Sequence, residues 1–507
     1  MKSTSNFDAT GQALALRLQH SSFRKDKIFR MAFEVALSEK DKRSRNELLR
    51  HIALRCAENN FLPRALQIVK VIDERVERAG ALAEVSVKSV PRVPWKRALH
   101  LIQHAVNLVN NAPFARNWLL MATSITLADQ RRFKQALQIL RRIDDLDLAA
   151  TASAEVAASM RDIKQSRHLL NTALARTRAL DCAIDSSELL YRLIQICRRP
   201  GLEDFAHRAI QIGLKKASAM ENVSDRDDFL ALLVSGLADA HFVSKAAHVT
   251  GKITTQRLKN WCFGEIAVQA TRIGLSPLSM QLVKRILSNR KVLVSSVMAE
   301  AALFHAEQHR FRKAVMFLSK VVHKDTFPLA ASRIALYLHS SNRQAEGFEL
   351  WSKALRTARS LSTKEKRHQA VQNVAIGYAR SGRIDLCQQA LQSIRSSVER
   401  KLALDKVATE ALQQSGLRIG LKLFKEMTEP DGMDSFLCAL ALELARKHEV
   451  QRAILTASMI ERPYSRAWAL ADLGPYVPMK RKRAKRETVA EIDAENQRKS
   501  GGTTRSH

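Results

Sequence analysis

The sequence predicts an all-α fold, a right-handed α-solenoid of about twelve helix pairs. Three observations lead to this fold class. A short motif returns every 30 to 40 residues or so along most of the chain, as in a repeat array. Glycine and proline are scarce, at 17 and 11 of 507 residues, so long helices with brief turns are expected. Sustained strand-like alternation with glycine-rich hairpin turns is absent from the sequence.

The repeated motif is a basic residue, an apolar or aromatic one, two or three spacers, and a small residue that opens an apolar run. Clear copies start at Arg131, Arg310 and Gly382. We call the small residue the anchor, because it lets two paired helices approach closely. Most anchors are 33 or 34 residues apart and others are near 40, which predicts that some units have helices about two turns longer. The anchors are Ala65, Ala98, Ala136, Ser166, Ala206, Ala246, Met280, Ala314, Gly347, Cys387, Gly420 and Ala453, of which Met280 is the one that is not small.

Each unit shows the periodicity of two amphipathic helices. After Ala314, apolar residues follow at Phe317, Leu318 and Val321, which places them on one face of a helix with 3.6 residues per turn. A comparable stripe precedes the turn. We therefore expect the units to stack into one continuous curved array rather than into separate globules.

Two terminal segments frame the repeats. Residues 1–24 form an N-terminal segment, expected to be flexible at its start, and residues 25–473 form the solenoid. Residues 474–507 form a basic tail that we expect to be disordered, since prolines stop the last helix and a polar, charged stretch follows. Its basic run is typical of a nuclear localisation segment in a nucleated cell, or of an anchor for nucleic acid or a membrane surface. The cations of this run are Lys480, Arg481, Lys482, Arg483, Lys485 and Arg486.

The repeats resemble the tetratricopeptide family, in which two antiparallel helices form units of about 34 residues. The resemblance is best from Tyr378 to Cys387, and aromatic residues precede several anchors by three positions, as Phe133 precedes Ala136. It covers residues 25–473 but is degenerate, because most of the family's Trp, Gly and Pro positions differ. A weaker resemblance links the chain to pentatricopeptide repeats, which read single-stranded RNA one base per repeat. Of the last five positions that would read bases, only Asn373 has the short polar side chain that such a code uses.

The chain is strongly basic, with a net charge of +33, and most of that charge lies in the repeats. Basic residues recur at the turn inside ten of the twelve units, so stacking would line them along one edge. Three interpretations stay open: compensation of the first helix's C-terminal dipole, binding of polynucleotide phosphates, or contact with an acidic protein surface. The candidate partner-binding residues are Arg97, Lys134, Lys164, Lys245, Lys313, Arg343, Arg383 and Arg418; Arg64 and Arg452 share the pattern.

Catalytic, cofactor and metal motifs are missing, so no catalytic, cofactor-binding or metal residue is predicted. His305 and His309 share a helical face, but Glu307 stands one position too late for a zinc-protease motif. The six cysteines form no C-x-x-C pair and are expected to be reduced and buried. We expect the aromatic residues before the anchors to pack across the turns rather than to stack on bases; they are Phe61, Trp95, Phe133, Phe242 and Phe311.

The sequence therefore favours a non-catalytic scaffold that holds a peptide or helix of a partner protein, an acidic one, in its groove. The alternative is a nucleic-acid-binding protein that contacts the phosphate backbone without reading bases. A location inside the cell, in the cytoplasm, is expected, because the N-terminus has no signal-peptide pattern and no stretch is long and apolar enough to span a membrane. Neither the partner's identity nor the oligomeric state follows from the sequence.

Overall fold

The computed structural model describes residues 25–180, 183–286, 291–425 and 434–477. In these ranges the chain folds into twenty-six α-helices and one 3-10 turn, with no strand. The helices pack as sequential pairs, which confirms the predicted all-α repeat architecture. Their apolar stripes explain this packing, because each helix buries one face against its pair partner and its flanks against neighbouring units.

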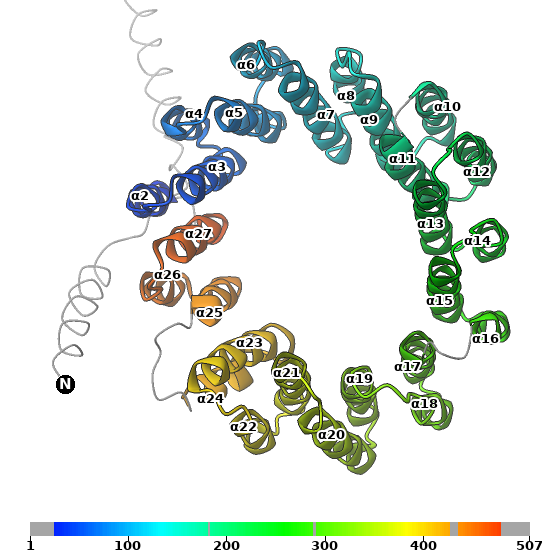
Figure 1. Cartoon of the computed structure of the whole chain (residues 1–507). Helices are drawn as coiled ribbons and strands as arrows, with labels where there is room; N and C mark the ends of the chain where they lie inside the picture. Colours follow the sequence, from blue (N-terminus) through cyan, green and yellow to red (C-terminus); the bar gives the residue numbers. More distant parts are fainter. Residues whose placement is uncertain (1–24, 181–182, 287–290, 426–433, 478–507) are drawn as a thin grey trace, which may run out of the picture.

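The helices form two concentric circles (Figure 1). Each inner helix contacts the next inner helix, and each outer helix covers the inner helix with which it pairs. The inner helices are α3 (Lys42–Glu58), α5 (Arg75–Ser89), α7 (Pro113–Asp129), α9 (Leu146–Ser159), α11 (Ala183–Ile196), α13 (Val223–Asp239), α15 (Gln256–Arg272), α17 (Lys291–Glu307), α19 (Phe327–Ser340), α21 (Lys364–Arg380), α23 (Ser397–Ser415), α25 (Asp434–Arg446) and α27 (Pro463–Leu473).

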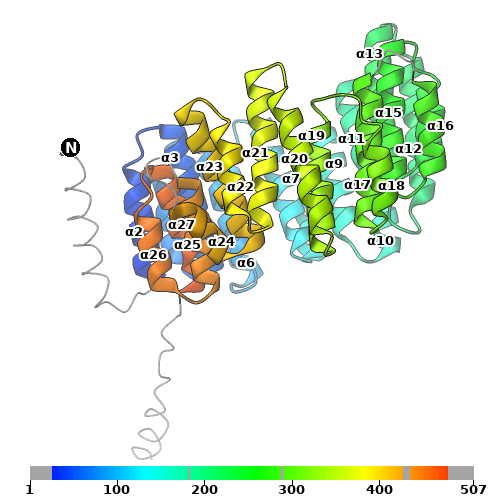
Figure 2. The same cartoon turned by 90° about the horizontal axis from the view of Figure 1, so that it is seen from below.

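The outer helices alternate with the inner ones along the chain. They are α2 (Lys25–Leu37), α4 (Leu62–Val71), α6 (Trp95–Leu108), α8 (Phe133–Leu140), α10 (Ile163–Ala179), α12 (Glu203–Ser218), α14 (Val243–Thr250), α16 (Ser276–Arg285), α18 (Phe311–Leu318), α20 (Gln344–Arg359), α22 (Ile384–Gln392), α24 (Leu417–Lys425) and α26 (Val450–Ser458). Figure 2 shows the same helices from the side, standing next to one another around the ring.

The ring is closed by its two ends. The last inner helix, α27, packs against α25 on one side and against α3 on the other, and the first helix, α2, covers it as the outer partner. We call α27 and α2 the closing pair. In α2, Ile28, Phe29, Ala32 and Ala36 are buried with the same spacing as Leu169, Leu170, Ala173 and Thr177 in α10. Twelve pairs thus come from consecutive helices, as the sequence predicts, and a thirteenth is composite.

The outer helices that follow an anchor come in two lengths. Most of them have 8 to 10 residues, as in α8 and α4. Four are longer, namely α6 with 14, α10 with 17, and α12 and α20 with 16 residues. The long helices contain the anchors Ala98, Ser166, Ala206 and Gly347, after which the anchor spacing widens. The prediction that widely spaced units carry longer helices is confirmed.

Small buried residues lie where the paired helices meet. The alanine anchors are fully buried, and at Gly347 a Cβ atom would come within 3.0 Å of the Ala335 carbonyl oxygen. One predicted anchor is wrong. Met280 is only partly buried, whereas the preceding Ser279 is buried and hydrogen-bonded to Thr271 across the pair, with 2.8 Å between their hydroxyl oxygens. The small residue in this unit is therefore one position earlier than the pattern indicated.

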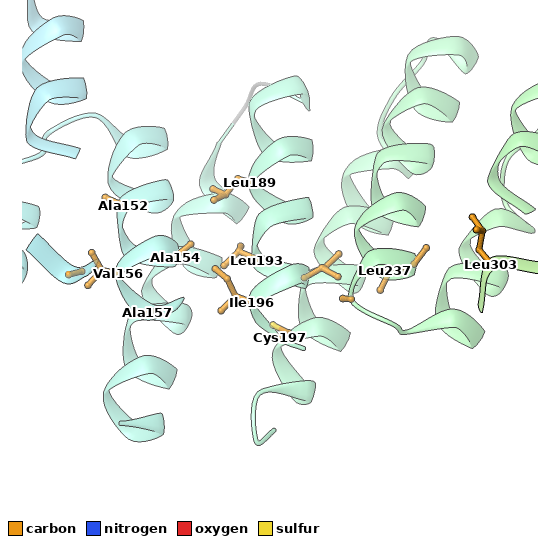
Figure 3. Close-up of a cluster of buried hydrophobic side chains, with 14 of the residues drawn as sticks. Ala152, Ala154, Val156, Ala157, Leu189, Leu193, Ile196, Cys197, Leu237 and Leu303 are labelled. Carbon is orange, nitrogen blue, oxygen red and sulfur yellow. The ribbon is translucent and has the colours of Figure 1, made fainter. Parts of the chain in front are cut away.

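The core continues from pair to pair without interruption. Figure 3 shows side chains of α9, such as Ala154 and Val156, beside Leu189 and Leu193 of α11, with Leu237 of α13 further along the array. All five are essentially inaccessible to solvent. Since every inner helix is buried on both flanks, its exposed residues lie on the face toward the centre of the ring or at its ends.

Polar residues buried in the first turns of inner helices fix the turns that return from the outer helices. Asp227 in α13 accepts hydrogen bonds from the backbone N–H groups of Thr254 and Thr255, with oxygen–nitrogen distances of 3.1 and 2.7 Å. Burial alone would raise the pKa of Asp227, but these bonds and that of the Thr254 hydroxyl outweigh it and lower the pKa to about 2. In α7, the Asn117 side-chain oxygen likewise accepts a hydrogen bond from the backbone N–H of Asp144, with 3.2 Å between oxygen and nitrogen.

Candidate functional site

One edge of the ring carries all the turns that lead from an inner helix to the next outer helix. We call this edge the turn rim. Most of these turns contain one residue with positive φ five positions before the anchor; the non-glycine examples are Asn60, Arg131, His241, His309, Asn342 and His448. The residue that follows donates its N–H to a carbonyl of the inner helix, as Arg132 does to Leu127 at 2.9 Å. This hydrogen bond ends the inner helix in a Schellman turn and sets the angle of the outer helix.

The predicted cations all lie on the turn rim. Lys134 and Lys313 lie in the first turns of α8 and α18, and Arg343 and Arg383 are the N-cap residues of α20 and α22. A cation at a helix N-terminus faces the positive end of the helix dipole, which is unfavourable. In the described structure none of these four side chains donates a hydrogen bond to a carbonyl group at the end of the preceding inner helix.

Two other arginines, which the sequence interpretation missed, do compensate helix C-termini. Arg92 donates to the carbonyl oxygen of Ala57 at 3.4 Å, and also to that of Glu58. Arg199 donates to the Ala157 and Ala158 carbonyl oxygens at 3.0 and 2.9 Å, at the end of α9. Each arginine has a proline beside it, Pro91 or Pro200, in a turn without the usual spacing. The proline next to each arginine was the sequence signal that could have identified these two turns as unusual.

Several predicted cations have intramolecular partners. Arg343 forms an ion pair with Glu346 at 2.6 Å, and Arg383 forms one with Asp385 at 2.7 Å. These contacts hold the pKa of Asp385 below its usual range, chiefly through the hydrogen bond from Arg383. The ammonium group of Lys245 lies 4.9 Å from the centre of the Phe242 ring. Arg343 and Arg383 also lie over aromatic rings of the preceding unit, as Arg64 lies over the ring of Phe33.

The remaining predicted cations have no ion pair, hydrogen bond or ring contact through their side chains in the described part of the chain. They are exposed, and they are Arg97, Lys134, Lys164, Lys313 and Arg418. The structure thus brings all eight candidates to one edge but leaves only these five free within the ranges it describes. The predicted tail cations, Lys480, Arg481, Lys482, Arg483, Lys485 and Arg486, lie outside the described residues. Gly474–Val477, at the start of the predicted tail, belongs to the ring, while the disorder predicted for the rest stays a prediction.

Exposed apolar side chains gather on the inner helices. We call the centre-facing surface of these helices the inner face. Its clearest stretch is on α7, where Phe114 is 69% exposed and Trp118 is 43% exposed. A shallow hollow next to Trp118 is lined by Gly80, Ala83 and Val87 of α5. The exposed large apolar residues of the inner helices are Val76, Phe114, Trp118, Leu146, Val223, Leu232, Trp261, Val292, Leu329, Val398 and Leu402.

The two histidines that share a helical face, His305 and His309, both have structural contacts. His305 is buried against Phe317, and burial, with the charges of Lys313 and Arg310, lowers its pKa. His309 occupies a left-handed turn position and contacts the Ser341 hydroxyl. Within the described ranges no group of three or more His, Cys, Asp or Glu residues is arranged to hold a metal ion.

The described cysteines are free thiols, four of them buried and Cys438 partly so, and burial raises the pKa of each to about 12. These five therefore behave as small core residues, as predicted, while Cys182 lies outside the described residues. The aromatic residues before the anchors pack on the core, as Phe61 does edge-on against Phe29. Neither set is available for chemistry or for base stacking.

No helix in the described ranges has both the length and the apolar character needed to cross a bilayer. No protein-family model matches the chain, and no curated protein matches it. Among solved structures, the chain is similar to Ton1535 from Thermococcus onnurineus NA1, at 15% identity and a TM-score of 0.28, over 69% of this chain and 96% of that one. It is also similar to a circular tandem repeat protein with novel repeat topology and enhanced subunit contact surfaces, at 12% identity and a TM-score of 0.19, over 96% of this chain and all of that one. Likenesses this low carry no argument about function; the helix pairs themselves identify a helical repeat protein.

Proposed function

We propose that the protein is a non-catalytic scaffold of tetratricopeptide-like helix pairs, and that its inner face binds a segment of another protein. The observation that carries this proposal is the concentration of exposed apolar side chains on the inner helices. Contiguous exposed apolar surface on a folded protein marks interaction sites, because leaving it in water is unfavourable. In the described part of the chain, the outer helices expose fewer such residues.

The chemistry of the inner face fits a peptide or a helix. Phe114 and Trp118 are four residues apart on α7, so they lie on one face and form a pair of aromatic anchors. The neighbouring helix presents Gly80, whose missing side chain leaves open space, because no atom lies within 4 Å of the position that a Cβ atom would take. An apolar side chain of a partner fits there, beside Trp118.

An acidic partner is favoured by the charge of the protein. The net charge of +33 creates a positive potential that attracts acidic segments and speeds their association. Two carboxylates of inner helices are paired with neighbouring cations, Glu84 with Arg50 and Glu58 with Lys88, so they would repel an acidic segment less.

The proposal is tested by site-specific photo-crosslinking in the cell that makes the protein. A photoreactive amino acid at Trp118 is compared with one at Met316, which is similarly exposed but lies on the outer helix α18. We expect a discrete partner crosslinked at position 118 and not at 316, and a synthetic peptide of the crosslinked segment should bind. Trp118→Ala should then weaken that peptide by at least about tenfold. Crosslinking at 316 alone contradicts the proposal, and so does equal binding of the peptide by Trp118→Ala and the wild type.

A further inference from the structure

The turn rim is not uniform in charge, because its cations are neutralised in some turns and not in others. In the pairs α5–α6, α7–α8 and α9–α10, each turn exposes two cations whose side chains have no partner within the described structure. We call these residues the free arc: Lys96, Arg97, Arg131, Lys134, Arg161 and Lys164.

Elsewhere on the rim Lys313 and Arg418 are also free in the described structure, but at three other turns an arginine is neutralised by a carboxylate. Arg343 pairs with Glu346 at 2.6 Å, Arg383 with Asp385 at 2.7 Å, and Arg452 with Glu449 at 2.7 Å. We call Arg343, Arg383 and Arg452 the paired arc. In each case the acid belongs to the same turn, so the local sequence supplies the counter-charge. The free arc has no such ion pair among the residues that the structure describes.

The carboxylates that do lie near the free arc have other tasks. Asp162 caps α10 by accepting from the N–H of Lys164 at 2.8 Å, and Asp129 accepts from the hydroxyl of Ser159 at 2.8 Å. Neither carboxylate forms an ion pair with a free-arc cation in the described structure. The six cations outnumber these two carboxylates, so the three turns keep a net positive charge.

The fold does not need these cations. Arg97, Lys134 and Lys164 lie in the first turns of α6, α8 and α10, where a positive charge opposes the helix dipole by a few tenths of a kcal/mol. Residues that break a local rule without a structural return are expected at functional sites. An anion bound beside these cations would make their position favourable, because it would interact well both with them and with the helix N-terminus.

We propose that the free arc binds the phosphate backbone of nucleic acid without reading its bases. Cations repeated in three consecutive pairs match a polymer with repeating negative charge. Trp95 and Phe133, the aromatic residues beside them, pack against the core and are not free to stack on bases. An acidic protein surface fits less well, because protein interfaces have an apolar centre, and Ile163, 40% exposed, is the one large apolar side chain that these three turns expose in the described structure.

The test uses the full-length protein and a fluorescent single-stranded oligonucleotide of random sequence, titrated across a salt series. The free-arc variant carries Arg97→Gln, Lys134→Gln and Lys164→Gln; the matched control carries Arg343→Gln, Arg383→Gln and Arg452→Gln. Both sets change the net charge equally, on the same rim. With about 0.7 counterions released per phosphate contact, we expect the salt slope to fall by about 2 in the free-arc variant and to stay nearly constant in the control. Affinity at low salt should fall at least about tenfold in the free-arc variant alone.

Three results would overturn the proposal. Equal losses in both variants would mean that net charge, not the arc, governs binding. Loss of binding when residues 478–507 are deleted, with the ring intact, would assign it to the tail. A polyglutamate competitor that displaces the oligonucleotide at equal charge concentration would identify an acidic protein surface as the ligand. Circular dichroism of both variants checks that the helices are retained.

Discussion

The closing pair can be set beside an ordinary pair such as α9 and α10. Both consist of an inner and an outer helix, and both bury the same apolar spacing on the outer helix. A short turn joins α9 to α10, whereas α2 and α27 stand at opposite ends of the repeats. Joining ends that far apart costs a loop-closure entropy that grows slowly with length, so a regular helix pair can form from distant segments when the curvature brings them together.

The closing pair differs in the contacts that supplement its apolar packing. Asp472 of α27 accepts a hydrogen bond from Arg55 of α3 at 2.7 Å, and contacts the His51 Nε2 atom at 2.9 Å. The His51 ring stacks on Trp468, with 3.8 Å between the ring centres. These contacts are directional, so they select the register in which the last inner helix meets the first. In an ordinary pair the connecting turn already selects it.

The largest expected effect comes from removing a buried aromatic side chain of the closing pair. Phe29 in α2 and Phe205 in α12 are both essentially inaccessible on outer helices. Phe29→Ala and Phe205→Ala should each lower the free energy of unfolding by about 3–5 kcal/mol, through lost burial and a cavity. Only Phe29→Ala should separate the ends of the ring. Denaturant unfolding measures the first effect, and the distance between spin labels at Lys42 and Glu461 measures the second.

Because Phe29→Ala and Phe205→Ala should lose similar stability, a difference in label distance between them can be assigned to the closing pair. If the labels move apart in both variants, opening reflects general destabilisation rather than a weak point at the closing pair. If they move in neither, α2 stays docked without Phe29, and the remaining contacts, such as Ile28, hold the ring closed.

A smaller effect is expected from a single added carbon at the same place. A Cβ atom on Gly474 would lie 2.3 Å from the Cζ atom of Phe29, so Gly474→Ala forces the ring or the 3-10 turn to move. We expect a loss of about 1–3 kcal/mol, the usual effect of overpacking. Gly80→Ala in α5 is the control, because no atom lies within 4 Å of its Cβ position. It should stabilise the helix by about 0.5–1 kcal/mol in thermal or denaturant unfolding.

The closing pair should also depend on pH through Asp472. Burial would raise the pKa of this carboxyl, but the hydrogen bond and charge of His51 and the charge of Arg55 outweigh it and lower the pKa. A lowered folded pKa adds stability above the unfolded value of about 3.9, and this stability is lost as the pH falls through the folded pKa. Asp472→Asn should therefore destabilise by about 1–2 kcal/mol at neutral pH and flatten the acid side of the stability profile.

Asp227→Asn provides the counterpart in an ordinary unit, since the pKa of Asp227 is about 2 and its partners are local. Both variants should lose the part of their stability that depends on pH in acid, but only Asp472→Asn should move apart the labels at Lys42 and Glu461. A profile of Asp472→Asn that parallels the wild type at every pH would show that the carboxylate does not stabilise closure.

Much of the repeat architecture could be predicted because its signals are local. Ala314 and the apolar residues after it define an outer helix within a few residues, and the wide spacing after Ser166 indicated the length of α10. Closure could not be predicted, because His51 and Asp472 are 421 residues apart and leave no periodic trace. The ion pairs of the paired arc could have been predicted from the sequence, since Asp385 follows Arg383 by two positions.

The smallest expected effect concerns the turns on either side of the closing pair. His448 before α26 and Asn60 before α4 both adopt left-handed backbone geometry, with φ values of 65° and 70°. Asparagine tolerates this region better than histidine does. His448→Gly should therefore gain up to about 1 kcal/mol, less the greater entropy of glycine in the unfolded chain, and Asn60→Gly should gain less. Denaturant unfolding of the two variants measures the difference, and neither should move the labels, because relief of turn strain leaves the contacts of the closing pair unchanged. A larger gain for Asn60→Gly would mean that the Asn60 side chain strains its turn, in contrast to the ordinary preference of asparagine.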